Sequence, residues 1–250
     1  MSGTEEIVTA AILVIGDEIL SGRTKDKNIG YIADHCTQIG IQVREVRVVA
    51  DLEQEIVDAV NALRARYTYV FTTGGIGPTH DDITADCIAK AFGVGIDHHP
   101  YVKQLLLESF ARRGVEATAA RLRMARIPDT AELVENRLSV APGFQLGNVI
   151  VMAGIPNVMH AMLDAVTPRL RTGRKMLSVT IELLRPEGEI AEVFGEVQAE
   201  YPDVPMGSYP FNRDARVFGT QLVLRSTDPD QLAAAEARLR ARLAEKGIAT

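Results

Sequence analysis

Tryptophan is absent from the 250 residues of this chain, and the only cysteines are Cys36 and Cys87. Because these two cysteines are far apart and lie on separate predicted helices, we expect small buried side chains, not a metal site or a disulfide framework. Aromatic residues make up only 5% of the sequence, and 33 acidic residues outnumber 27 basic ones, which gives a net charge of -6. Non-specific binding of nucleic acid, which needs a positive surface and stacking aromatics, is therefore disfavoured.

Long hydrophobic runs are also missing. The longest, Ala10 to Gly16 and Val149 to Pro156, are far shorter than the roughly 18 residues that span a bilayer. The N-terminus reads Met-Ser-Gly-Thr-Glu-Glu, which is acidic where a secretory signal begins with basic residues. The sequence thus predicts a cytoplasmic protein with no membrane partner.

The composition that remains is that of an ordinary globular protein, with 46% hydrophobic and 24% charged residues. In residues 1–171, short apolar runs alternate with segments of helical periodicity, which is typical of a parallel sheet wrapped by crossover helices. Strands are expected at residues 11–15, 42–49, 69–73 and 149–152, and helices at about 29–39, 56–63, 82–92, 101–113, 117–125 and 157–170. The stretch from Pro128 to Gly143 is predicted to be irregular. Residues 1–171 should therefore form a layered α/β domain.

The pattern changes near Arg171 to Lys175, a segment with little apolar content and one glycine, which indicates a domain boundary. Beyond it, strands are expected at residues 176–183, 206–209 and 217–225, and helices at 190–199 and 229–246. Two of these strands follow each other without an intervening helix, so they should pair antiparallel. Residues 176–250 are thus predicted to form a small α+β domain with βαββα order.

Acidic residues follow the ends of three predicted strands. Asp17 and Glu18 come after the first strand, Asp51 after the second, and Asp81 and Asp82 after the third. Because ligands bind beyond the carboxyl ends of parallel strands, we expect these side chains to converge on one ligand. Carboxylates in such a place can bind Mg²⁺, which commonly takes one or two of them together with substrate phosphates.

The loop after the third strand is rich in glycine. Gly74, Gly75 and Gly77 allow positive φ and a close approach of the backbone to a ligand, and a helix that begins near Asp82 would point free N–H groups into the same space. This pattern predicts an anion cradle. The turn has no lysine or arginine, so charge compensation for a diphosphate would come from amides and a divalent cation.

Two simpler interpretations stay open at this point. Glycines after a strand often form nothing more than a turn, and Asp82 can serve only as a helix N-cap. Carboxylates at three neighbouring strand ends, however, repel one another when no cation lies between them. This repulsion favours a ligand site over the simpler interpretations.

Several stretches of the chain together resemble one known family. They are Gly16 to Thr24 with Asp26 and Asn28, then Asp51, Thr73 to Thr84, Ala91 to Gly93, Arg121 to Pro128 and Ala141 to Phe144. This pattern is similar to the molybdopterin-binding domain of the competence/damage-inducible protein A (CinA) group. Met206 to Pro210 resembles a stretch in eukaryotic FAD synthases. Since the chain ends at Thr250, the deamidase domain of full-length CinA proteins is not expected.

The resemblance implies a three-layer α/β sandwich with a mostly parallel sheet, shared with molybdenum-cofactor biosynthesis proteins. It also implies that the glycine turn and the strand-end aspartates hold a phosphorylated ligand or its metal. The implied catalytic residues are Asp51 and Asp82, and the implied metal ligands are Asp17, Asp51 and Asp82. The implied ligand-binding residues are Ser21, Asn28, Thr73, Gly74, Gly75, Gly77, Pro78, Thr79 and Thr84.

The leading functional expectation is a hydrolase that depends on Mg²⁺ or another divalent metal and cleaves the diphosphate of an ADP-ribose-like or FAD-like dinucleotide. CinA-group domains are associated with ADP-ribose pyrophosphatase activity, and FAD synthase relatives with FAD hydrolysis. Two alternatives stay open: a non-catalytic module that binds molybdopterin or a nucleotide, and adenylyl transfer to molybdopterin. A homo-oligomer is also expected, because relatives of this fold commonly assemble and the small domain offers an edge strand.

Overall fold

The structure is a computed structural model that describes residues 7–214 and 217–249. The chain divides into two compact units, Met1–Gly173 and Arg174–Thr250. The division falls inside the segment 171–175 where the sequence pattern changes. None of the helices in the described residues combines the length and the apolar character that crossing a bilayer requires.

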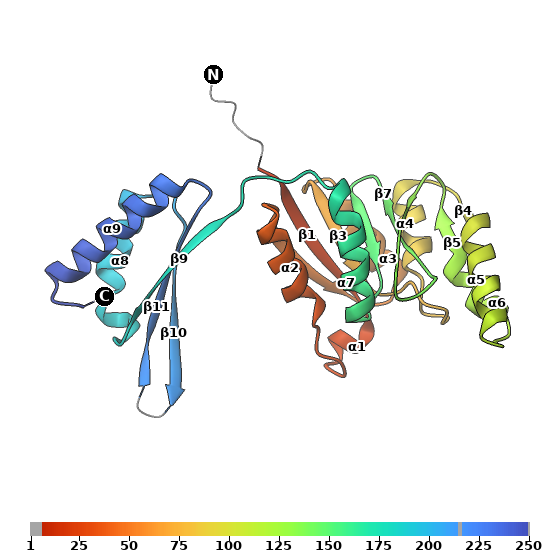
Figure 1. Ribbon diagram of the computed structural model, residues 1–250, viewed down its shortest axis with the longest axis horizontal. Helices are drawn as coiled ribbons and strands as arrows, with labels where there is room; N and C mark the ends of the chain where they lie inside the picture. The colour runs from red at the N-terminus through yellow and green to blue at the C-terminus, as the bar shows by residue number, and fades with distance from the viewer. Residues whose placement is uncertain (1–6, 215–216, 250) are drawn as a thin grey trace, which may run out of the picture. The chain divides into compact units, whose positions relative to one another are not determined.

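A six-stranded sheet with the order β2-β1-β3-β8-β7-β6 forms the centre of the first unit (Figure 1). Its strands are β1 Thr9–Ile15, β2 Gln42–Val49, β3 Tyr69–Thr73, β6 Glu132–Val134, β7 Gly143–Leu146 and β8 Val149–Met152. The pairs β1–β2, β1–β3 and β3–β8 are parallel, whereas β7 and β6 extend the sheet antiparallel. The prediction of a mostly parallel sheet is confirmed.

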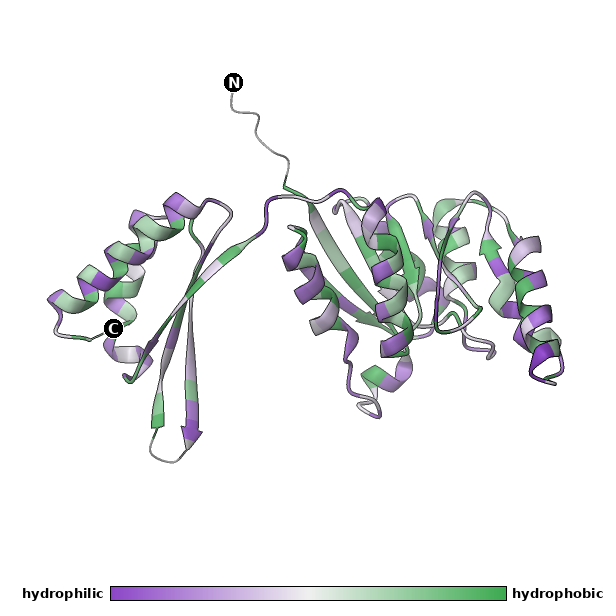
Figure 2. Cartoon of the chain, viewed as in Figure 1, coloured by the Kyte–Doolittle hydropathy of each residue, from purple (hydrophilic) through white to green (hydrophobic). Residues whose placement is uncertain are grey.

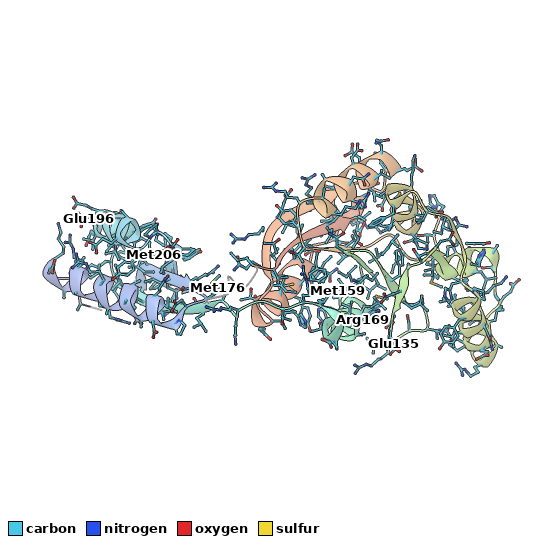
Figure 3. All side chains as sticks on the ribbon, turned by 90° about the horizontal axis from the view of Figure 1, so that it is seen from above. Glu135, Met159, Arg169, Met176, Glu196 and Met206 are labelled. Atoms are coloured by element: carbon cyan, nitrogen blue, oxygen red, sulfur yellow. The ribbon has the colours of Figure 1, made fainter. Side chains whose placement is uncertain are left out.

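Helices cover both faces of this sheet, so the unit has three layers (Figure 1). One face carries α2 Asn28–Gln38 and α7 Pro156–Val166, and the other carries α3 Glu53–Arg64 and α4 Thr84–Phe92. Successive side chains of β1 point to opposite faces of the sheet. Ile12 lies in the core under α2 and α7, together with Met159 (labelled in Figure 3). Leu13 lies in the core under α3 and α4. β1, β3 and β8 are accordingly buried and largely apolar along their length (β1 and β3 in Figure 2).

The remaining elements of this unit are short or peripheral. They are α1 Asp17–Leu20, α5 Pro100–Arg112, α6 Ala119–Leu122, 3-10 turns at Arg123–Ala125 and Thr167–Arg169, and the antiparallel pair β4 Ile96–His98 and β5 Arg126–Pro128. Two predictions need correction. The stretch from Pro128 to Gly143, expected to be irregular, holds β6 and the start of β7, because strands of three or four residues are too short to show a periodicity. The helix expected from Asp82 begins at Thr84, because the preceding residues close a turn.

The second unit is a three-stranded antiparallel sheet with two helices on one face. Its elements are β9 Leu177–Leu183, α8 Ala191–Glu200, β10 Met206–Asp214, β11 Val217–Ser226 and α9 Pro229–Glu245, with the strand order β10-β11-β9. Leu222 of β11, Val197 of α8 and Leu239 of α9 are fully buried in its core. The βαββα prediction is confirmed. β9 and β10 are edge strands, and self-association through such an edge stays a prediction.

Both cysteines are buried and unbonded, as expected. Burial raises the pKa of the Cys36 thiol to about 12 and, with help from nearby acidic groups, that of Cys87 to about 12 as well. Both thiols therefore stay protonated at neutral pH and pack as small apolar groups.

Trypsin is expected to cut the native protein first between Arg171 and Lys175, because this segment belongs to no helix or strand and joins the two units. Mass spectrometry of the first products should therefore show two fragments that meet in this segment. First cuts between β1 and β3 would contradict the division into two compact units.

Candidate functional site

The loops that follow β1 and β2 are joined by two hydrogen bonds at the carboxyl end of the sheet. The backbone N–H of Gly16 donates to the carbonyl oxygen of Val49 at 3.1 Å. The backbone N–H of Asp17 donates to Oδ2 of Asp51 at 2.9 Å. Asp17 and Asp51 therefore lie next to each other.

Asp51 stands among like charges. Its partial burial raises the pKa of its carboxyl group, the hydrogen bond from Asp17 N–H opposes this change, and the charges of Asp17, Glu18 and Asp81 raise the pKa further. The net result is a raised pKa. Asp81 is thus a residue of the third loop whose charge acts on Asp51. Acidic side chains from three loops therefore lie near one another at this edge of the sheet.

The glycine turn after β3 can be built only from glycine at two positions. Gly74 has φ 105° and Gly75 has φ 66°. An added Cβ on Gly74 would lie 2.1 Å from the carbonyl oxygen of Ile15, and one on Gly75 would lie 2.1 Å from Oγ1 of Thr84. The glycines therefore serve both a left-handed backbone and a close approach to neighbouring chain.

Hydrogen bonds fix this turn on two sides. Gly74 N–H donates to the carbonyl oxygen of Met152 at 3.1 Å, at the end of β8. The Thr84 hydroxyl donates to the carbonyl oxygen of Gly74 at 3.0 Å, and Thr84 N–H donates to that of Gly75 at 3.0 Å. Thr84, which is fully buried, thus joins the start of α4 to the turn. In contrast, the backbone N–H groups of Gly75, Ile76 and Gly77 make no hydrogen bond within the described part of the chain.

Asp82 closes the second half of the turn. Its Oδ2 accepts hydrogen bonds from the backbone N–H and the hydroxyl of Thr79, at 2.8 Å for the N–H. A Cβ on Gly77 would lie 2.6 Å from the same oxygen. The N-cap of α4 is Ile83, and no side chain caps this helix, so the interpretation of Asp82 as an N-cap is wrong. Pro78 lies half-buried between Gly77 and Thr79.

Asn28 reaches the turn from the start of α2. It is only 4% exposed, and its Nδ2 donates to the carbonyl oxygen of Gly154 at 2.8 Å. Gly154 in turn touches Gly74, since a Cβ there would lie 3.3 Å from the Gly74 Cα. Oδ1 of Asn28 and Oγ1 of Thr73 are buried without a hydrogen-bond partner among the described residues. Ser21, by contrast, is exposed at the end of α1.

The acidic edge fits a divalent cation that is completed by a ligand. In residues 7–214 and 217–249, no three Asp, Glu, His or Cys side chains are gathered closely enough to hold an ion by themselves. Mg²⁺ commonly needs only one or two carboxylates, because waters and substrate phosphates supply its other oxygen ligands. Asp51 and Asp17 can provide that pair, and a cation bound there would offset the like charges that add to the effect of burial on the pKa of Asp51.

Two arginines that the sequence analysis did not identify also reach the glycine turn. Together they line a pocket whose polar walls are Gly75, Gly77, Asp82, Asp86, Arg123 and Arg126. Arg126 forms an ion pair with Asp86, and Arg123 Nη2 donates to the carbonyl oxygen of Asp82 at 3.3 Å. These contacts join residues 40 and 41 positions apart, so the stretch Arg121 to Pro128, although part of the family resemblance, does not by itself indicate them.

Comparison with known proteins adds to this geometry. Residues 11–172 match the family described as "Probable molybdopterin binding domain", and residues 175–250 match "FAD synthase, middle domain". A protein from Pyrobaculum calidifontis is 33% identical over 211 residues, which cover 81% of this chain and 80% of that protein. A protein from Aeropyrum pernix is 33% identical over 192 residues, which cover 75% of this chain and 68% of that protein.

Among solved structures, the protein CinA from Thermoplasma acidophilum, described as having unknown function, is 33% identical with a TM-score of 0.59. The similarity covers 64% of this chain and 96% of that one. Residues 11–172, which match the family model, hold the glycine turn and the acidic edge described above. The chain therefore belongs to the molybdopterin-binding-domain family, is CinA-like in its first unit, and carries a second unit like the middle domain of FAD synthase.

Proposed function

We propose that this protein is a divalent-metal-dependent hydrolase that cleaves the diphosphate of a dinucleotide of the ADP-ribose or FAD type. The observation that carries the proposal is the acidic edge around Asp51, which lies beside a glycine turn with three unpartnered backbone N–H groups in the described chain. A site with carboxylates for a cation and amides for phosphate oxygens suits a diphosphate. The likeness of residues 175–250 to the middle domain of FAD synthase supports a nucleotide as the ligand.

Each part of the site has a separate task in this proposal. Asp51 and Asp17 hold the cation, whose chemistry is to neutralise phosphate oxygens and to lower the pKa of a water molecule. The N–H groups of Gly75, Ile76 and Gly77 bind phosphate oxygens and stabilise the charge that develops on them. Asp82 holds the turn through Thr79 with one oxygen, which leaves Oδ1 for the cation or a water.

The direct test is product analysis after incubation with ADP-ribose or FAD, each with Mg²⁺, Mn²⁺ or Co²⁺ and with a chelator. Hydrolysis should yield AMP with ribose 5-phosphate from ADP-ribose, and AMP with FMN from FAD. We expect product only when metal is present. The absence of product with every metal, together with tight binding of a pterin or nucleotide, would favour the non-catalytic module instead.

A further inference from the structure

We infer that the pocket between the glycine turn and Arg123 and Arg126 is a binding site for a phosphate group, and that these two arginines supply its positive charge. The inference rests on the proposed function, because the glycine turn forms one wall of this pocket. It adds a cationic subsite to a site whose other part, around Asp51, is acidic. The ligand would thus meet a cation at one place and two guanidinium groups at another.

The two arginines have more donors than their partners use. Arg126 pairs with Asp86, and Arg123 Nη2 lies 3.9 Å from the other oxygen of the same carboxylate. Each guanidinium carries five N–H donors; Nε is buried in both residues, and Nη1 of neither residue makes a hydrogen bond within the described chain. An acceptor that enters the pocket can therefore bond to these unused Nη1 donors.

The fold holds both guanidinium groups in place before a ligand arrives. Arg123 opens a 3-10 turn and is attached to the glycine turn through the carbonyl oxygen of Asp82. Arg126 opens β5, which pairs with β4, and Ala125 between them is fully buried. The side chains of Arg123 and Arg126 are only 36% and 26% exposed. Partial removal from water strengthens charge-assisted hydrogen bonds to an anion.

The walls of the pocket indicate which group it takes. Gly75 and Gly77 line it together with both arginines, and Asp86, the partner of the arginines, lines it as well. Arginine binds phosphate with two parallel hydrogen bonds, so this combination favours a phosphate group over a neutral one.

The test measures the binding of inorganic phosphate to the full chain, in the absence of metal, by isothermal titration calorimetry. Arg126→Gln and Arg123→Gln should each weaken phosphate binding about tenfold or more, the usual loss for a hydrogen bond to a charged group. Asp86→Asn should strengthen it several-fold, because the carboxylate no longer competes for the guanidinium groups. Arg169→Gln is the matched control: Arg169 (labelled in Figure 3) also pairs with a carboxylate, Glu132, and is 34% exposed. The Arg169→Gln variant should bind phosphate with the same affinity as the unaltered protein.

A purely structural ion pair gives a different pattern. In that case the Arg126 and Asp86 variants lose thermal stability, yet their affinity for phosphate equals that of the unaltered protein, and the inference fails. It also fails if the unaltered protein binds no phosphate at about 10 mM, or binds acetate equally well. If an arginine variant does not fold, Asp86→Asn still decides by the sign of its change in affinity. Arginine-dependent phosphate binding without hydrolysis would overturn the proposed function alone, and hydrolysis with arginine-independent phosphate binding would overturn this inference alone.

Discussion

Replacing Asp51 with asparagine is expected to lower the rate of diphosphate hydrolysis about 100-fold or more without disturbing the fold. The amide oxygen of asparagine can still accept the 2.9 Å hydrogen bond from Asp17 N–H, so the loop keeps its shape while the charge that holds the cation is lost. The measurement is kcat with ADP-ribose and FAD at saturating metal. Asp82→Asn belongs in the same series, because its amide oxygen can still accept the bond from Thr79 N–H.

The stability of Asp51→Asn provides an independent check. Since the folded state raises the pKa of Asp51, the folded protein binds this proton more tightly than the unfolded chain does. As the pH rises from the ordinary pKa of an aspartate to the raised pKa of Asp51, ionisation of this carboxyl group therefore lowers the stability of the folded protein. We expect the variant to lack this decline and to melt at neutral pH at the same temperature or higher. Asp34→Asn, on the exposed side of α2, is the control that should change neither activity nor stability. Full activity of Asp51→Asn would exclude the metal-carboxylate mechanism.

Gly74→Ala is expected to cost about 3 kcal/mol or more of unfolding free energy, combining left-handed strain with a steric clash. The new Cβ would lie 2.1 Å from the carbonyl oxygen of Ile15, which is backbone at the end of β1 and cannot move aside cheaply. Gly93→Ala is the matched control, because Gly93 has φ 68° but open space around its Cβ position. This control should lose about 1 kcal/mol, from backbone strain alone. Chemical denaturation measures both values, and equal losses would contradict the close approach at Gly74.

The parts of the fold that the sequence predicts are those whose residues are buried on both faces. Ala11 to Ile15 are almost completely buried, and their unbroken apolar run indicates β1 directly. β7 escapes prediction although Phe144 is 1% exposed, because a four-residue strand next to a glycine shows no periodicity. β6, with only one buried residue, Val134, shows even less.

The same division applies to the candidate site. The proximity of Asp17 and Asp51 follows from their places after adjacent parallel strands, so topology alone predicts it. The sequence cannot show that Asp82 bonds to Thr79, or that the charge of Asp81 acts on Asp51, because both depend on the shape of the turn. Nor can the sequence show that Arg126 pairs with Asp86, because the 40 positions between them include α5 and the turns after it.

The support of the glycine turn by β8 also sets an order of events during synthesis. Asn28 and Gly154, which hydrogen-bond beside Gly74, are 126 positions apart in the chain. At about 5–20 residues per second, a ribosome needs roughly 6–25 s to add the residues between them. Until then Gly74 has no Met152 carbonyl to bind, and the turn cannot take its final shape. A ligand that recognises this turn can therefore stabilise only chains that have grown past Gly154, and gives no help to shorter nascent ones.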